Sequence, residues 1–245
     1  MSESEKKAQD ISKPEYSGIS ELVNTENGLI GYSTSIIRKF YKNLKLSENS
    51  RILEFGAGTG FLAELFRSEY KINPICVELD PNLCETIKTK NFECLQTLSE
   101  VKGKFEYIYT SNVLEHIEND IEILIELRQT LNSKGLIAIY VPAHPVLFST
   151  MDKTVGHVRR YTKRELVSKA KNAGFEVKKV QYDDFLGFFA SLTVKIIGYN
   201  KGALGSTKSL QFYDRVIYPI SAILDSIGFR KLLGKNLLLI CQNPE

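Results

Sequence analysis

Two groups of residues in this 245-residue sequence have types and spacings suited to chemistry. The first is the segment Glu54-Phe-Gly-Ala-Gly-Thr-Gly60, followed by a second acidic residue, Glu78. The second combines all three histidines of the chain with an Arg-Arg-Tyr run (His116, His144, His157, Arg159, Arg160 and Tyr161). Glycines at this density let a backbone loop approach a ligand closely. Imidazole can transfer protons near neutral pH, and guanidinium groups bind anions. We therefore expect a ligand-binding loop and a separate reaction site.

Alternating strands and helices must position these residues. Short apolar runs predict buried strands at 51–55, 74–78, 92–95, 105–110 and 136–141. Helical spacing separates them at 59–70, 81–90 and 119–131, and a capping box at Thr162 opens a later helix. Two more strands are predicted at 175–182 and 236–242. This alternation indicates crossover connections and a doubly wound, mainly parallel α/β sheet with helices on both faces.

The remaining segments predict additions to this sheet. Residues 1–45 form a polar tail and a helical preface, and residues 183–235 form an apolar and basic helical insertion before the last strand. The ligand-binding domain then comprises residues 46–182 and 236–245. The glycine-rich part of the insertion, residues 198–210, is expected to be mobile and to gate a pocket.

The spacing of the glycines limits the ligand. A dinucleotide-binding loop needs a third glycine or an alanine three positions after the second, where this sequence has Phe61. A P-loop would need Gly-Lys-Ser/Thr, which does not follow. Both the pyrophosphate and the P-loop interpretations are therefore disfavoured.

Three motifs in the same order resemble those of the class I, seven-stranded S-adenosylmethionine-dependent methyltransferases. They are the Glu54-to-Gly60 segment, Glu78 at the end of the second strand, and Ser111-Asn-Val-Leu-Glu-His116 after the fourth. The resemblance covers about residues 30–182 and the last strand. It implies a Rossmann-like fold with seven strands, S-adenosylmethionine as cofactor, S-adenosylhomocysteine as product, and methyl transfer as the activity.

The resemblance also implies cofactor contacts. The loop residues Gly56, Ala57, Gly58 and Gly60 would lie under the methionine end of the cofactor, and Glu54 would support the loop and the amino-acid ammonium. Further contacts would come from Glu78 to the ribose hydroxyls, Leu79 to adenine and Asn112 to the amino-acid moiety. The family commonly has an acidic residue after the third strand, and this chain departs from it with Gln96 and Thr97, which we expect to substitute at the adenine edge.

The segments 142–152 and 156–161 follow the fifth strand, on the ligand side of such a sheet. They resemble a subset of these enzymes associated with glycan, lipid and quinone-like biosynthesis. His144 or His157 would serve as general base if the acceptor is a hydroxyl. Arg159 and Arg160, with Tyr161, would hold a carboxylate or phosphate of the acceptor. The alternative is that they only tie the loop to the sheet. His116 is expected to play a supporting or capping role.

Composition restricts the partners and the location. Hydrophobic residues are 43% and charged residues 25%, which excludes a mainly disordered chain. Net charge is +3, but residues 151–245 carry +8, which favours an anionic acceptor or peripheral membrane contact. The four cysteines are too far apart for a metal knuckle, so we expect reduced thiols and no metal. Without a spanning segment or signal sequence, the expected location is the cytoplasm.

The sequence therefore favours a methyltransferase acting on a small-molecule, glycan-linked or lipid-linked acceptor, and not on nucleic acid. We expect a monomer or a homodimer. Two alternatives stay open: a nucleotide- or NAD-binding oxidoreductase, and a non-catalytic module that binds the cofactor.

Overall fold

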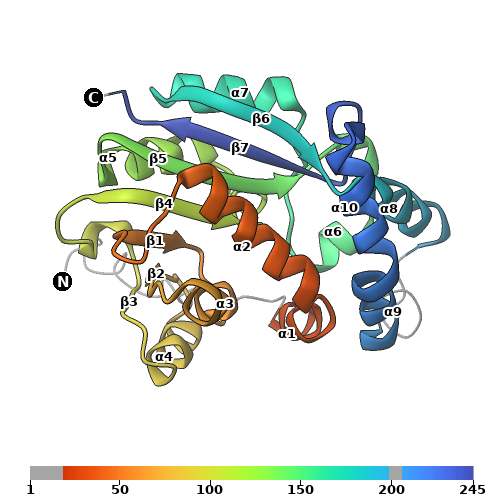
Figure 1. Ribbon diagram of the computed structural model, residues 1–245, viewed down its shortest axis with the longest axis horizontal. Coiled ribbons are helices and arrows are strands. Elements are labelled where there is room, and N and C mark those ends of the chain that lie inside the picture. The colour runs from red at the N-terminus through yellow and green to blue at the C-terminus, as the bar shows by residue number, and fades with distance from the viewer. Residues whose placement is uncertain (1–18, 199–205, 245) are drawn as a thin grey trace, which may run out of the picture.

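A computed structural model of the chain describes residues 19–198 and 206–244. Within these residues seven strands form one sheet in the order β3-β2-β1-β4-β5-β7-β6 (Figure 1). The strands are β1 (Ile52–Phe55), β2 (Ile75–Val77), β3 (Cys94–Leu95), β4 (Phe105–Ser111), β5 (Leu131–Pro142), β6 (Glu176–Asp183) and β7 (Asn236–Gln242). The first five strands pair in parallel, and β7 runs antiparallel between β5 and β6. The predicted doubly wound, mainly parallel sheet is confirmed.

Helices surround the sheet and fill the chain before β7. Their bounds are α1 (Ile19–Gly28), α2 (Ile30–Leu44), α3 (Phe61–Tyr70), α4 (Pro81–Thr89), α5 (Asp120–Thr130), α6 (Thr150–Thr154), α7 (Lys163–Asn172), α8 (Phe185–Ile197), α9 (Thr207–Phe212) and α10 (Tyr218–Ser226). A π-helical turn, Tyr213–Ile217, joins α9 to α10. Within the described residues no helix has the length and apolarity to span a bilayer.

Alternating side chains of the central strands supply the two hydrophobic faces. In β5, Ile137 and Ile139 belong to the core covered by α5 and α7. Ala138 and Tyr140 point to the other face, where they join Phe40 of α2 in a second core. This period of two buries both faces of β5, as expected for a strand in the centre of a covered sheet.

One strand begins earlier than the sequence indicates. The segment Asn132–Gly135 was expected to separate a helix from a strand beginning at Leu136, but β5 already starts at Leu131. Leu131 pairs with Phe105 of β4, and Lys134 takes a left-handed φ of 62°. The polar residues therefore form a bulge within β5, because the register with β4 passes from Phe105–Leu131 to Tyr107–Leu136 and leaves the four residues between them without a β4 partner.

The N-terminal helices and the insertion pack together at one end of the sheet. The carboxylate of Asp214 accepts hydrogen bonds from the backbone N–H groups of Gly31 (2.9 Å) and Tyr32 (2.6 Å), which caps the first turn of α2. A Cβ on Gly28 would approach Leu210 of α9 to 2.5 Å, so these two segments touch closely. Figure 1 shows α1, α6, α8, α9 and α10 gathered where β5 ends. They surround the carboxyl edge of the sheet.

A buried ion pair fixes α2 to the edge strand β6. Lys39 Nζ lies 2.7 Å from Asp183 Oδ2, and the Tyr140 hydroxyl donates to the same oxygen at 2.6 Å. Because Asp183 is buried, both donors are needed to satisfy its charge. This contact holds the helical preface against the insertion.

Two expectations concern residues outside the described ranges. Residues 1–18, which include the predicted polar tail, lie there, as do residues 199–205 of the expected gate. The last part of the expected gate is described, and it is ordered into the start of α9, where the Ser206 hydroxyl accepts from the backbone N–H of Ser209.

Replacing Phe40 by alanine tests the packing of α2. This ring is fully buried against Tyr109 and Tyr140, so Phe40→Ala should lower the free energy of unfolding by about 3–5 kcal/mol. Urea unfolding followed by circular dichroism measures the change. The control Ile227→Ala, at a side chain that is 70% exposed, should cost less than about 0.5 kcal/mol. Equal effects of the two substitutions would contradict this account of the core.

Candidate active site

The loop after β1 can be built only with glycines at its critical positions. Gly56, Gly58 and Gly60 all have positive φ angles, of 74°, 56° and 79°. A Cβ on Gly56 would lie 2.3 Å from the side chain of Val113, which leaves no room for any other residue. The backbone N–H groups of Gly56 and Ala57 donate to the carbonyl of Val77 at the end of β2. The loop is thus drawn tightly between β1, β2 and the segment after β4.

Glu78 fastens this loop. Its Oε2 accepts the backbone N–H of Gly58 at 2.8 Å, and its Oε1 accepts the backbone N–H of Asp80 at 3.0 Å. Burial raises the pKa of Glu78, and these two hydrogen bonds oppose the rise. Each carboxylate oxygen can accept a further hydrogen bond, so the group can still bind hydroxyls of a ligand.

Glu54, at the base of the loop, faces the interior. It is 2% exposed, and its Oε2 accepts the hydroxyl of Tyr109 at 2.8 Å. Burial raises the pKa of Glu54 to about 8, although the Tyr109 hydrogen bond acts in the opposite direction. The side chain is held by Tyr109 of β4, and both its support of the loop and its contact with a cofactor ammonium stay predictions.

The first helix lies over the loop. A Cβ on Gly58 would approach the Leu22 side chain of α1 to 3.1 Å. The Thr59 hydroxyl donates to Glu26 of the same helix at 2.7 Å. Helical spacing of apolar residues predicted a helix here. It did not reveal that this helix covers the glycine loop, because that spacing carries no information about tertiary contacts.

The other predicted cofactor contacts follow the carboxyl ends of neighbouring strands. Leu79 follows β2 and is 57% exposed, and Gln96 and Thr97 follow β3. Asn112 follows β4 in a left-handed conformation, and its backbone N–H donates to the Tyr140 carbonyl at 2.8 Å. The sheet brings all these residues to one edge, beside the glycine loop.

On the other side of this edge, Asp152 organises the loop that follows β5. Its Oδ1 lies 2.8 Å from His157 Nδ1 and 2.8 Å from Arg160 Nε, and its Oδ2 accepts the backbone N–H of Ser149. Burial opposes ionisation, but the hydrogen bonds from His157 and Arg160 prevail and lower the pKa of Asp152 to about 2. The carboxylate is charged and holds the His157 ring and the Arg160 guanidinium in place.

Asp120 binds the next two predicted acceptor residues. Its carboxylate receives Arg159 Nη1 (3.0 Å), the Tyr161 hydroxyl (2.7 Å) and Lys169 Nζ (2.7 Å). Tyr161 is fully buried, and Arg159 also donates to the carbonyl of Glu118. The structure therefore gives Arg159, Arg160 and Tyr161 partners within the chain, and their binding of an acceptor stays a prediction.

The two candidate bases make different contacts. The His144 ring stacks on Tyr182, with centroids 4.7 Å apart, and meets the edge of Phe188. Burial lowers the pKa of His144, so its ring is neutral near pH 7 and can accept a proton. His157 instead joins Glu115 and His116.

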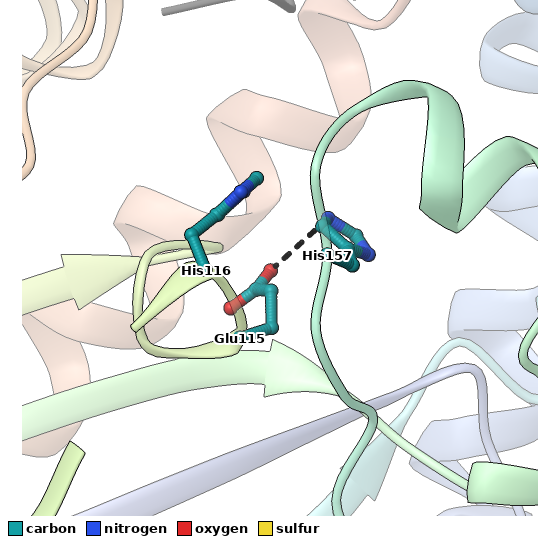
Figure 2. A group of neighbouring side chains, drawn as sticks. All are labelled: Glu115, His116 and His157. Carbon is teal, nitrogen blue, oxygen red and sulfur yellow. Dashed lines mark ion pairs between the residues drawn. The ribbon is translucent and has the colours of Figure 1, made fainter. Parts of the chain in front are cut away.

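Glu115, His116 and His157 converge where the segment after β4 meets the segment before α7 (Figure 2). His157 Nε2 lies 3.7 Å from Glu115 Oε1, and the two imidazole rings are 4.7 Å apart. Burial raises the pKa of Glu115 to about 8 and, together with the charge of His157, lowers the pKa of His116 to about 4. Sequence analysis overlooked Glu115, although an adjacent Glu-His pair and a distant histidine were a usable signal.

Lys235 is a second residue that sequence analysis overlooked. It immediately precedes β7, and its Nζ lies 5.3 Å from the ring centroid of Tyr32 and 5.8 Å from that of Tyr213. No carboxylate of the described residues forms an ion pair with it, and burial lowers the pKa of its ammonium group. A lysine between two loops carried no sequence signal, because only the fold brings Tyr32 and Tyr213 to it.

The protonation of Glu54 yields a pH-dependent prediction. Its folded pKa of about 8 exceeds that of an unfolded glutamate, so the neutral acid stabilises the fold at low pH and this contribution is lost as the pH rises. Glu54→Gln should therefore gain stability relative to the unsubstituted protein from about pH 5 to 8, by at most about 1.4 kcal/mol per pH unit. Urea unfolding at several pH values measures this difference.

Glu85→Gln is the matched control because Glu85 is exposed on α4. The difference in free energy of unfolding between Glu85→Gln and the unsubstituted protein should change little with pH. A flat difference for Glu54→Gln over the same range would show that Glu54 is ionised in the folded protein.

Comparisons with known proteins agree with this arrangement. A family model described as a methyltransferase domain matches residues 32–180. No curated protein sequence matches the chain.

Solved structures share the fold at low identity. A chain of the Haloferax volcanii complex that contains the Trm112 methyltransferase activator matches with a TM-score of 0.62 and 10% identity, covering 94% of this chain and 98% of that chain. Phosphoethanolamine N-methyltransferase 2 from Haemonchus contortus, solved with S-adenosyl-L-methionine, has the same TM-score and 16% identity, with 96% of this chain and 59% of that chain covered. The cyclopropane synthase MmaA2 from Mycobacterium tuberculosis matches with a TM-score of 0.54 and 13% identity, over 84% and 83% of the two chains.

These similarities show a common fold, and the family match extends over more than half of the chain. It includes the glycine loop, Glu78 and the cluster around Asp152. The chain belongs to the methyltransferase domain family and has its class I, Rossmann-like fold.

Proposed function

We propose that this protein transfers a methyl group from S-adenosylmethionine to an anionic acceptor with an apolar part. The observation that carries the proposal is the glycine loop after β1, fastened through Gly58 to Glu78 at the end of β2. When bound, S-adenosylmethionine supplies a methyl group already activated by its sulfonium. The chain must then align the acceptor and the methyl group and exclude water, since alignment supplies much of the acceleration in such a displacement.

The residues around the loop fit this cofactor. Glu78 has acceptor capacity left for the two ribose hydroxyls, and the exposed Leu79 beside it offers an apolar surface for adenine. Asn112 and the loop backbone would bind the amino-acid end. The cover of α1 over Gly58 and Thr59 would shield the bound cofactor from water, so this helix would have to move for the cofactor to enter.

Lys235 supports an anionic acceptor. The guanidinium groups of Arg159 and Arg160 are already held by Asp120 and Asp152, whereas Lys235 has two tyrosine rings and no carboxylate paired with it among the described residues. A phosphate or carboxylate could therefore bind Lys235 without displacing a carboxylate of the protein. His144, neutral at pH 7, would accept the proton of a hydroxyl or amine acceptor.

The insertion supports an apolar part on the same acceptor. Its helices expose several large apolar side chains (Phe189, Ile196, Ile197, Ile220, Ile223 and Ile227). Lys195, Lys231 and Arg230 lie in or near the same helices. Apolar faces with basic residues beside them suit a lipid-linked acceptor or an anionic membrane surface.

Calorimetry tests the cofactor assignment. The protein should bind S-adenosylmethionine and S-adenosylhomocysteine but not NAD, and Glu78→Ala should weaken both affinities about 10- to 100-fold because charged hydrogen bonds are lost. The control Glu85→Ala, at the exposed carboxylate on α4, should leave both unchanged. Binding of NAD instead would favour an oxidoreductase, and unchanged affinity in Glu78→Ala would overturn the proposed cofactor geometry.

Product release tests the acceptor class. Formation of S-adenosylhomocysteine is measured with lipid, glycan and polar small-molecule fractions of a cell extract as acceptors, and the lipid fraction should be active. Lys235→Met should raise the KM for that acceptor about 10- to 100-fold and leave the Kd for S-adenosylmethionine unchanged. The control is Lys88→Met, at an exposed lysine on α4, which should change neither value. Cofactor binding without turnover in any fraction would favour a non-catalytic module.

A further inference from the structure

Three potential metal ligands come together at the carboxyl edge of the sheet, close to the cofactor loop. Glu115 and His116 follow β4, and His157 comes from the loop that precedes α7. One ligand atom from each residue lies within 4.8 Å of the other two, and Figure 2 shows the Glu115 carboxylate directed at the His157 ring. Val113, two residues before Glu115, is the side chain that packs on Gly56. The group therefore lies beside the proposed methyl-transfer site.

The Glu115 carboxylate is the least satisfied group of the described chain at this edge. Its side chain is fully buried, and neither of its oxygens has a hydrogen-bond partner. The nearby Arg160 donates its Nε to Asp152 instead, and the 3.7 Å separation from His157 Nε2 is too long for a hydrogen bond. A buried carboxylate that accepts no hydrogen bond is costly, so a ligand that binds its oxygens would stabilise it.

Both histidines are oriented as metal ligands usually are. His157 Nδ1 lies 2.8 Å from the Asp152 carboxylate, and His116 Nδ1 lies 3.2 Å from the carbonyl of Gly156. Both oxygens accept, so in the neutral rings Nδ1 carries the proton and Nε2 carries the lone pair. Metal-binding histidines typically donate their outer N–H to a carboxylate or a backbone carbonyl in this way.

We propose that Glu115, His116 and His157 bind one divalent transition-metal ion, such as Zn²⁺ or Mn²⁺, through one carboxylate and two imidazole ligands. This donor set suits such ions and excludes sites built on thiolates. Ligand atoms about 2.1 Å from one ion lie at most about 4.2 Å apart, so small side-chain rotations close the observed 4.8 Å. Three protein ligands leave a position for water or, if the proposed function holds, for an acceptor oxygen.

Metal analysis of the full-length protein tests the site. The protein is stripped with EDTA, dialysed against Zn²⁺ or Mn²⁺, and analysed by mass spectrometry for bound metal; Co²⁺ loading adds an absorption spectrum that reports the ligands. We expect one ion per chain, lost in Glu115→Gln and His157→Gln. Glu115→Gln should still fold, because it replaces a buried carboxyl group that accepts no hydrogen bond by a neutral group of the same shape.

Two further variants separate ligation from general damage. His144→Gln removes a histidine from the same sheet edge that belongs to a different cluster, so it should keep the metal. Asp152→Asn changes the hydrogen-bond partner that His157 shares with Arg160, removes no ligand, and should weaken metal affinity about 10- to 100-fold. Absence of bound metal from the unsubstituted protein would overturn the proposal, and so would undiminished metal binding by Glu115→Gln and His157→Gln.

Calorimetry with S-adenosylmethionine on the same samples distinguishes this proposal from the proposed function. Metal binding without cofactor binding would leave the metal site standing and refute methyl transfer. Cofactor binding without metal binding would refute the metal site and leave the proposed methyl transfer standing.

Discussion

The hydrogen bond from the Gly58 backbone N–H to the Glu78 carboxylate is the contact on which the site depends most. It joins the loop after β1 to the end of β2, two parallel strands whose carboxyl ends lie next to each other only because the sheet pairs them. Gly56 must approach Val113 too closely for any side chain, which pulls the segment after β4 against the same loop. Three strand ends are thereby fixed around one small volume at the edge of the sheet.

Buried carboxylates organise the opposite half of this edge. Asp152 holds His157, Arg160 and the start of α6, while Asp120 holds Arg159, Tyr161 and Lys169. Each is surrounded by donors, so the charge it carries is compensated within the fold. Glu115 is the exception in this region, since it has the burial of these groups without their donors. This contrast distinguishes carboxylates that hold loops through hydrogen bonds from a buried carboxylate that accepts none.

The N-terminal helices and the insertion complete the site from two distant parts of the chain. Asp214 of the insertion caps α2, Asp183 at the end of β6 binds Lys39 of α2, and α1 covers the glycine loop. Lys235 reaches its two tyrosine rings through the same assembly, one from α2 and one from the insertion. The surroundings of Lys235 thus depend on contacts between segments about 180 residues apart in sequence.

The sequence by itself determined the sheet, the glycine loop and Glu78, because strand burial and glycine conformations are local properties that leave periodic or compositional marks. It also located all three histidines at the ligand edge, since each follows or faces a predicted strand end. It could not tell that Arg159, Arg160 and Tyr161 are bound by Asp120 and Asp152, because those pairings join residues up to about 40 positions apart. The orphaned carboxylate of Glu115, the tyrosine rings around Lys235 and the cover of α1 were decided only by tertiary structure, since whether a charge has a partner depends on what the fold packs against it.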